Sequence, residues 1–173
     1  AYHCEINRVS RTMLTKVPEE LADYRQAAFC ALGGIALEGI HQAEVVPGET
    51  VAVIGMGLVG QIVCRILNAY GCDVIGYDVV DKTMPGTRLK AFINSGDDNA
   101  ADMTKALTRG RGVDKVIITA ATNSNAPMDL AAAIARDRGI ICMIGVTQMN
   151  IDRRPYYERE LSFRIARSYG AGR

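Results

Sequence analysis

The segment VAVIGMGLVGQIVCRIL, residues 51–67, constrains the fold of this 173-residue chain more than any other stretch. It opens with a continuous apolar run, which is typical of a strand buried on both faces of a parallel sheet. Gly55, Gly57 and Gly60 follow in the spacing G-x-G-x-x-G, and an apolar helical pattern continues over 58–70. A buried strand, a glycine-rich turn and a helix in this order form the first part of a dinucleotide-binding unit.

Each residue type in the turn has a physical reason. Gly55 would permit the tight turn from strand to helix, Gly57 would let the backbone approach a pyrophosphate, and Gly60 would let helix and strand pack closely. The amides of Leu58 and Val59 would face the phosphates from the positive end of the helix dipole. The sequence therefore predicts a phosphate-binding loop.

A second apolar strand, predicted over 72–77, ends on Asp78, which lies 18 residues after Gly60. Its carboxylate can accept hydrogen bonds from the adenosine ribose, and it would repel a 2′-phosphate, which favours NAD over NADP. Two alternatives stay open: the glycines could serve packing alone, or the loop could bind S-adenosylmethionine in a methyltransferase. The six-residue glycine spacing and the simple apolar strand at 139–146 argue against the methyltransferase.

Strand and helix patterns alternate from residue 50 onward, which predicts an α/β fold with a doubly wound, mostly parallel sheet of about six strands and helices on both faces. The other predicted strands are 91–94, 113–120, 139–146 and 161–167, with helices at 100–108 and 127–136. One or two strands are expected within 2–17, and a helical stretch over 26–44 is expected to break at Gly33-Gly34.

Composition excludes several classes of protein. Twenty Lys and Arg against 19 Asp and Glu give a net charge of +1, which argues against a nucleic-acid partner. No apolar run approaches the roughly 18 residues that a membrane span needs. Two His and five scattered Cys show no metal-ligand spacing, so no metal site is expected. We expect a cytoplasmic protein, with Cys64, Cys72 and Cys142 as buried core thiols.

Three ordered blocks carry a family resemblance: VVPGETVAVIGMGLVGQIVCRILNAYGCDVIGYD, GRGVDKVIITAAT and AIARDRGIICMIGV. Together they resemble the cofactor domain of the medium-chain dehydrogenases, the zinc-type alcohol dehydrogenase superfamily. The resemblance covers about residues 25–168 and implies an NAD-binding oxidoreductase that transfers hydride to or from an alcohol, polyol or sugar-like substrate. It assigns 46–173 to a Rossmann domain and 1–45 to an extension that links it to a missing catalytic domain.

The resemblance also implies further cofactor-binding residues. Lys82 would flank the adenosine ribose, beside the ribose acid Asp78. Two segments would lie along the cofactor, the first after the fourth strand and the second at the nicotinamide. Their residues are Ala120, Ala121 and Thr122, followed by Ile144, Gly145 and Val146.

The chain also departs from the family pattern. Met84-Pro85-Gly86 falls where a helix normally continues after the second strand, so that helix is expected to be abbreviated. The catalytic domain is almost absent, so no catalytic residue is assigned and the isolated chain is expected to bind cofactor without turnover. Cys30 lies near a family zinc-ligand position, but without partners here it is expected to be a buried core thiol.

Three expectations concern partners and the wider protein. The tail RRPYYERELSFRIARSYGAGR resembles a branch in which this unit is fused to a Gfo/Idh/MocA-type oxidoreductase domain. Family members often pair through the last strand, and a homodimer through 161–167 is therefore expected. A non-catalytic module that senses dinucleotides remains the alternative from another functional class.

Overall fold

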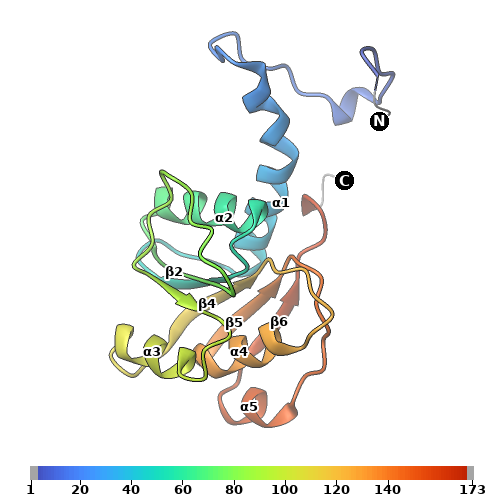
Figure 1. Cartoon of the computed structure of the whole chain (residues 1–173). Helices are drawn as coiled ribbons and strands as arrows, with labels where there is room; N and C mark the ends of the chain where they lie inside the picture. Colours follow the sequence, from blue (N-terminus) through green and yellow to red (C-terminus); the bar gives the residue numbers. More distant parts are fainter. Residues whose placement is uncertain (1–3, 171–173) are drawn as a thin grey trace.

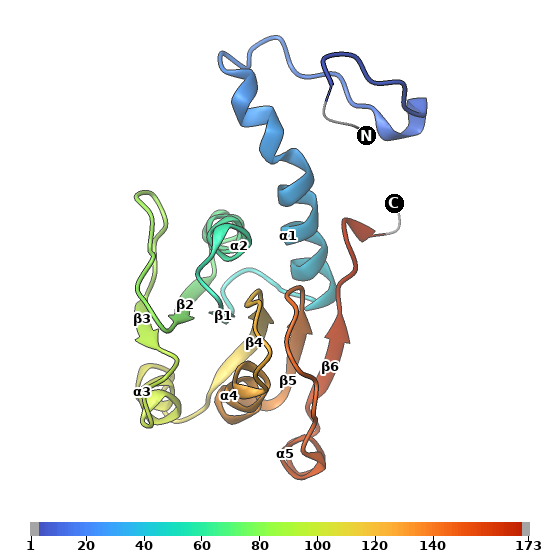
Figure 2. The same ribbon diagram turned by 45° about the vertical axis from the view of Figure 1, so that its right-hand side comes forward.

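A computed structural model describes residues 4–170, and its centre is a parallel sheet with helices on both faces (Figures 1 and 2). The strand order is β3-β2-β1-β4-β5-β6, so the chain builds one half outward from β1 and then returns to build the other half from β4. The strands are β1 (Thr50–Ile54), β2 (Asp73–Asp78), β3 (Ala91–Asn94), β4 (Val113–Ile118), β5 (Ala135–Met143) and β6 (Ser162–Ile165). The predicted α/β, doubly wound fold is confirmed.

Two hydrophobic cores sandwich the sheet. Val51 and Val53 of β1 face α1 (Cys30–Gln42) and α2 (Leu58–Ala69), whereas the alternate residues of β1 face α3 (Ala100–Leu107) and α4 (Ala126–Ile134). All five residues of β1 are therefore buried, and each large apolar side chain contributes about 1.5–3 kcal/mol by leaving water. This burial on both faces explains the continuous apolar run at 51–54.

The predicted break in the first helix is wrong, because α1 runs continuously through Gly33-Gly34. Gly34 and Gly39 instead permit close approach of later segments, whereas Gly33 faces open space. A Cβ on Gly34 would lie 3.2 Å from the Cβ of Tyr169, and one on Gly39 would overlap the side chain of Ile144. Sequence alone could not separate a helix-breaking glycine from one that makes room for a partner.

The segment before α1 extends away from the sheet (Figure 1). Its regular elements are two short 3₁₀ helices, η1 (Arg11–Met13) and η2 (Tyr24–Phe29). The strands expected within 2–17 are wrong for residues 4–17, which form no strand, while residues 2 and 3 lie outside the described part of the chain. Isolated alternation cannot form a strand when no neighbouring strand supplies hydrogen bonds.

No helix lies between β2 and β3. Residues 79–90, which we call the β2–β3 segment, have an irregular backbone that turns at Gly86, where φ is +85°. The helix that the sequence expected to be abbreviated is absent altogether, because proline and the left-handed glycine leave no helical run. The short helix α5 (Arg153–Glu158) was not predicted, since its six residues are largely polar and only the Asp152 cap marks its start.

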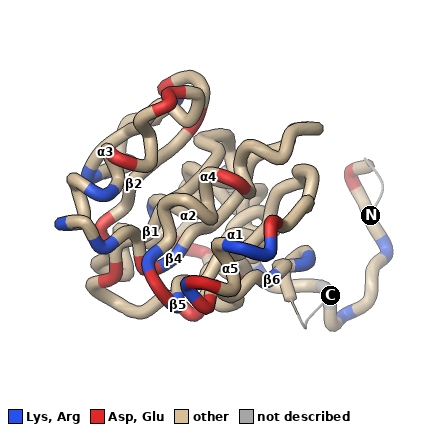
Figure 3. The backbone as a smooth tube through the Cα atoms, turned by 90° about the horizontal axis from the view of Figure 1, so that it is seen from below, with Lys and Arg blue, Asp and Glu red and all other residues tan. Residues whose placement is uncertain are grey.

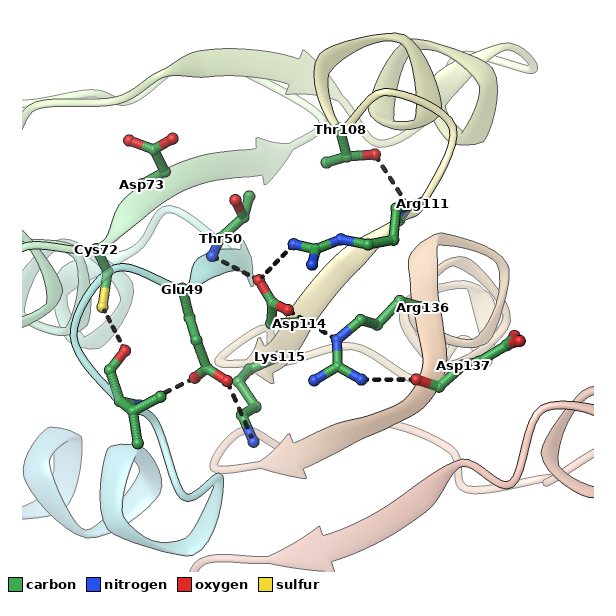
Figure 4. A network of polar contacts seen from close by, with 12 residues as sticks. Glu49, Thr50, Cys72, Asp73, Thr108, Arg111, Asp114, Lys115, Arg136 and Asp137 are labelled. Carbon is green, nitrogen blue, oxygen red and sulfur yellow. Dashed lines mark hydrogen bonds and ion pairs between the residues drawn. The ribbon is translucent and has the colours of Figure 1, made fainter.

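A network of charged side chains closes the edge of the sheet where the strands begin (Figure 4). Asp114 of β4 is 5% exposed; its Oδ2 accepts the backbone N–H of Thr50 at 2.9 Å, and its Oδ1 accepts Nε of Arg136 at 2.7 Å. Arg111 pairs with the same carboxylate at 3.2 Å. The carboxylate therefore joins the starts of β1, β4 and β5, through Thr50, Asp114 and Arg136.

Positive and negative residues are interspersed along the backbone tube in Figure 3. None of the helices in residues 4–170 has the length and apolar character that crossing a bilayer requires.

Candidate functional site

A cavity of about 570 Å³ opens at the opposite edge, where the strands end. Its wall includes Ile54 at the end of β1 and Asp78 at the end of β2. It lies where the order of strand addition reverses, between β1 and β4, which is the position where open α/β sheets bind ligands. Seven of the predicted site residues line it: Gly55, Gly57, Asp78, Lys82, Ala120, Ala121 and Thr122.

The glycine turn has the geometry that the motif predicts. Gly55 adopts φ +107°, in the region that favours glycine, and a Cβ there would meet the backbone of Ala120 at 2.5 Å. A Cβ on Gly60 would overlap the carbonyl oxygen of Gly55, so the helix can approach the turn only with glycine at this position. Gly57 differs, because a Cβ there would meet no atom within 4 Å. Gly57 thus faces open space on the cavity wall.

The first turn of α2 begins directly at this opening. Gly57 is the N-cap of α2, and Leu58 and Val59 are the first helical residues. Amides in a first helical turn have no partner within the helix and carry the positive end of its dipole. Neither Leu58 nor Val59 forms part of the cavity wall, so the binding of phosphate by their amides stays a prediction.

Asp78 is bonded to the glycine turn and to Lys82. Its Oδ2 accepts the N–H of Met56 at 2.8 Å, and its Oδ1 accepts Nζ of Lys82 at 3.0 Å. Burial by itself raises the pKa of this carboxyl group, but the bonds from Lys82, Met56 and Val80 outweigh it, so the pKa lies below its ordinary value. Asp78 is therefore a carboxylate at neutral pH.

Thr119, which sequence reasoning missed, holds the turn from the other side. Its hydroxyl donates to the carbonyl of Gly55 at 2.6 Å, and the N–H groups of Thr119 and Ala120 both donate to the carbonyl of Ile54. A polar residue at the end of an apolar strand was the available signal. Other cavity residues missed by the sequence come from the residue after β2, from the loop after β3 and from α4 and its approach: Val79, Ser95, Gly96, Ser124, Ala126, Pro127 and Leu130.

Ile144, Gly145 and Val146 lie beside the cavity without forming its wall. Val146 donates to the carbonyl of Ala120 at 3.0 Å, and Thr122 donates back to Val146 at 2.9 Å. A Cβ on Gly145 would overlap the Ala120 carbonyl oxygen. The two segments that the resemblance placed along a cofactor are thus adjacent, and their role in binding stays a prediction.

The cysteines correct one expectation and confirm three. Cys64, Cys72 and Cys142 are buried, as predicted, but Cys30 is exposed at the first position of α1. The side chain of Cys30 points out because the segment before α1 leaves the body of the domain. Within residues 4–170 no group of three or more His, Cys, Asp and Glu side chains could hold a metal ion.

Comparison with known proteins identifies the family. A model of the zinc-binding dehydrogenases matches residues 59–171. The chain belongs to the zinc-binding dehydrogenase family. This confirms the predicted membership of the medium-chain dehydrogenase superfamily. The family is named for zinc, but the described residues of this chain contain no group of three or more side chains that could hold a zinc ion.

Sequence relatives of this zinc-binding dehydrogenase chain include two sugar or polyol enzymes. Sorbitol dehydrogenase of Bacillus subtilis is 28% identical over 78% of this chain and 38% of its own length. Probable D-xylulose reductase A of Emericella nidulans is 26% identical over 91% of this chain and 46% of its own length. The chain thus spans less than half of either relative.

Solved structures agree on the fold. Zinc-dependent alcohol dehydrogenase 2 from Streptococcus pneumonia is 26% identical, with a TM-score of 0.75 over 90% of this chain and 46% of that one. Galactitol-1-phosphate dehydrogenase from Escherichia coli gives a TM-score of 0.81 over 92% of this chain and 48% of that one. At 19% identity the second shows the shared fold alone.

Proposed function

We propose that this chain is the NAD-binding unit of a larger oxidoreductase that transfers hydride between nicotinamide and an alcohol, polyol or sugar-like substrate. The observation that carries the proposal is the pairing of an open Gly57 with an ionised Asp78 on one cavity wall. Backbone amides at the N-terminus of α2 suit a pyrophosphate, and a carboxylate at the end of β2 suits ribose hydroxyls. A bound nicotinamide would supply the hydride acceptor or donor.

Three groups of residues match three parts of such a cofactor. Gly55, Gly57 and the first-turn amides of α2 would hold the pyrophosphate. Asp78 and Lys82 would bind the adenosine ribose. The two adjacent segments 120–122 and 144–146 would lie along the nicotinamide half, as the family resemblance implies.

NAD is favoured over NADP by charge. The Asp78 carboxylate would lie close to a 2′-phosphate and repel it, while a 2′-hydroxyl would donate a hydrogen bond to it. Lys82 is paired with Asp78 and 51% exposed, so its charge is partly neutralised by the same carboxylate. We therefore expect NADH to bind more tightly than NADPH, and Asp78→Ala to remove most of this preference.

The substrate class rests on the names of the two relatives that act on sorbitol and D-xylulose. Since the chain spans less than half of their length, the catalytic residues are expected in polypeptide beyond it, and the chain alone is expected to bind cofactor without turnover. Residues 1–45 would link it to that domain. Fusion to a Gfo/Idh/MocA-type domain and pairing of copies through β6, an edge strand of the sheet, remain predictions.

Gly57→Ala is the sharpest test of the binding site. Its Cβ would meet no protein atom and φ is −73°, so the only expected loss of stability is that of an alanine N-cap, about 0.5–1 kcal/mol. The methyl group would occupy the space where a pyrophosphate must approach the backbone, so the dissociation constant for NADH should rise at least about tenfold. Gly33→Ala is the matched control, because that glycine also faces open space but lies on α1, away from the cavity.

Calorimetric titration of both variants with NADH, NADPH and S-adenosylmethionine separates the outcomes. Weaker NADH binding in Gly57→Ala alone supports the proposed site. Equal binding by both variants would place the dinucleotide elsewhere. Binding of S-adenosylmethionine in preference to NADH would replace the oxidoreductase by a methyltransferase.

A further inference from the structure

One face of α2 holds the irregular β2–β3 segment through side-chain hydrogen bonds. Gln61, Arg65 and Asn68 are spaced by four and three residues, which places them in a row on one side of the helix. We call these three residues the α2 polar row. All three form hydrogen bonds with residues 82–88 of the β2–β3 segment.

Gln61 is the most buried member of the row, with 3% of its surface exposed. Its amide nitrogen donates to the carbonyls of Met56 at 3.2 Å and Lys82 at 3.0 Å. Its amide oxygen accepts the N–H of Met84 at 3.4 Å and the hydroxyl of Thr87 at 2.9 Å. Both donor hydrogens and both acceptor positions of the side chain are therefore used.

Arg65 and Asn68 extend this support toward the end of the segment. Arg65 donates to the carbonyl of Pro85 at 2.7 Å, and the side-chain oxygen of Asn68 accepts the N–H of Arg88 at 3.0 Å. Leu89 then packs over β2, where a Cβ on Gly76 would lie 2.9 Å from it. The row thus replaces, by polar contacts, the apolar packing that a helix would make there.

Gln61 and Asp78 both form hydrogen bonds with Met56 and Lys82. Asp78 accepts the N–H of Met56 and the ammonium group of Lys82, while Gln61 donates to the carbonyls of Met56 and Lys82. The four residues form a closed ring of hydrogen bonds that joins the glycine turn to the β2–β3 segment. Asp78 and Lys82 are also the two residues placed at the adenosine ribose.

We propose that Gln61 is a positioning residue for the adenosine-ribose end of the dinucleotide site, which it reaches by fixing the backbone of Met56 and Lys82. The inference rests on the proposed function. Gln61 itself would not contact the ligand. Loss of its side-chain bonds should release Lys82 from its place beside Asp78 and loosen the turn at Met56.

Gln61→Met tests this inference, because methionine keeps a similar length and removes all four hydrogen bonds. We expect faster amide hydrogen exchange across residues 83–88 in the ligand-free protein. The affinity for ADP-ribose should fall about tenfold, because binding would then have to order the released backbone of Met56 and Lys82, at a cost of about 1.4 kcal/mol. The affinity for nicotinamide mononucleotide, measured by NMR titration, should change less than about twofold, since that ligand lacks the adenosine half.

Two further variants keep the test informative if Gln61→Met is poorly folded. Thr87→Val, at a partly exposed position, removes the bond to Gln61 and the bond that the hydroxyl accepts from Nε of Arg65 at 3.3 Å. It should give the same pattern with a smaller effect. Thr108→Val is the matched control: it removes the acceptor of the Gly112 N–H, at 3.0 Å, far from the cavity. It should lower stability and leave both affinities unchanged.

The results distinguish this inference from the proposed function. If the unmodified chain binds neither ADP-ribose nor NADH, the proposed function fails and the inference fails with it. If it binds both, but Gln61→Met binds ADP-ribose with unchanged affinity, the inference alone is overturned. Equal losses for ADP-ribose and nicotinamide mononucleotide would also overturn it, because they would indicate a general structural role.

Discussion

The two edges of the sheet use charged side chains in different ways. At the edge where strands begin, Asp114 is enclosed by Arg111, Arg136 and the Thr50 amide, and its bonds join three strands. At the edge where strands end, Asp78 is also bonded to backbone and to a cation, but it forms part of a cavity wall. One carboxylate is committed to the fold, and the other retains a side open to a ligand.

This difference follows from the topology of a parallel sheet. The carboxyl ends of the strands lead into the loops that diverge around the reversal between β1 and β4, so a cavity forms there. At the amino ends, polar groups such as Asp114 are buried and must find partners within the protein. Substitutions at the edge where strands begin should therefore change mainly stability, and substitutions at the edge where strands end should change mainly binding.

Asp114→Ala should give the largest effect. It leaves the Thr50 N–H and two guanidinium groups without their shared partner, and breaking such a buried ion pair costs about 3 kcal/mol. Urea denaturation should show this loss, while the folded variant binds NADH with unchanged affinity. Asp137→Ala, a change at the exposed carboxylate next to Arg136, is the control and should stay within about 0.5 kcal/mol. Weaker NADH binding by folded Asp114→Ala would show that the two edges are coupled.

Gly60→Ala should affect both properties. Its Cβ would overlap the Gly55 carbonyl oxygen and lie 2.9 Å from the Thr119 hydroxyl, so the turn or the helix must move. Overpacking against backbone costs about 2–3 kcal/mol, and the displaced turn should also bind NADH at least about tenfold more weakly. Gly57→Ala, measured beside it, should weaken NADH binding with a much smaller loss of stability. If Gly60→Ala keeps full stability, the close packing of α2 on the turn is not required.

The parts of the fold that sequence predicted depend on local patterns. The apolar run of β1 and the glycine spacing identify a buried strand and a tight turn, and Gly55 indeed has a positive φ. Asp78 was found for the same reason, because it ends a short apolar strand at a recognisable distance from the glycines. The position of Asp78 at the end of β2 follows from those patterns, whereas its lowered pKa comes from its bonds to Lys82, Met56 and Val80.

The parts that sequence missed depend on contacts between distant residues. Asp114 bonds to Thr50 across 64 positions, and nothing local marks Asp114 as the centre of a network. Gln61 likewise has no local signal, because one of its partners, Thr87, lies 26 positions further along the chain. Cys30 was misjudged because the path of the chain before α1, away from the sheet, has no local signal.

Acid should remove the stability that Asp114 supplies at the amino edge. Burial raises the pKa of Asp114, but the Thr50 amide, Arg136 and Arg111 outweigh it and hold the pKa below its ordinary value. The unfolded chain therefore takes up a proton first as pH falls. The stability that Asp114 supplies is complete above the ordinary Asp pKa of about 3.9 and is lost as pH falls through the lower pKa of the folded state.

A pair of denaturation series isolates this contribution from that of other carboxylates. The stability difference between the unmodified chain and Asp114→Asn should be constant from about pH 8 to about pH 5 and shrink below about pH 4. A difference that stays constant down to pH 3 would show that Asp114 gains no stability from its charge.

Thr119→Val should give the smallest effect and the finest comparison of the two edges. The change keeps the shape of the side chain and removes its bond to the Gly55 carbonyl, which costs about 1 kcal/mol. Because the backbone N–H groups of Thr119 and Ala120 still hold Ile54, the strand end should stay in place and only the turn should loosen. Thr119→Ser, which retains the hydroxyl, should restore NADH affinity if the bond to the turn matters for binding. A loss of stability with unchanged NADH affinity would instead mean that this side of the cavity, like the amino edge, serves the fold alone.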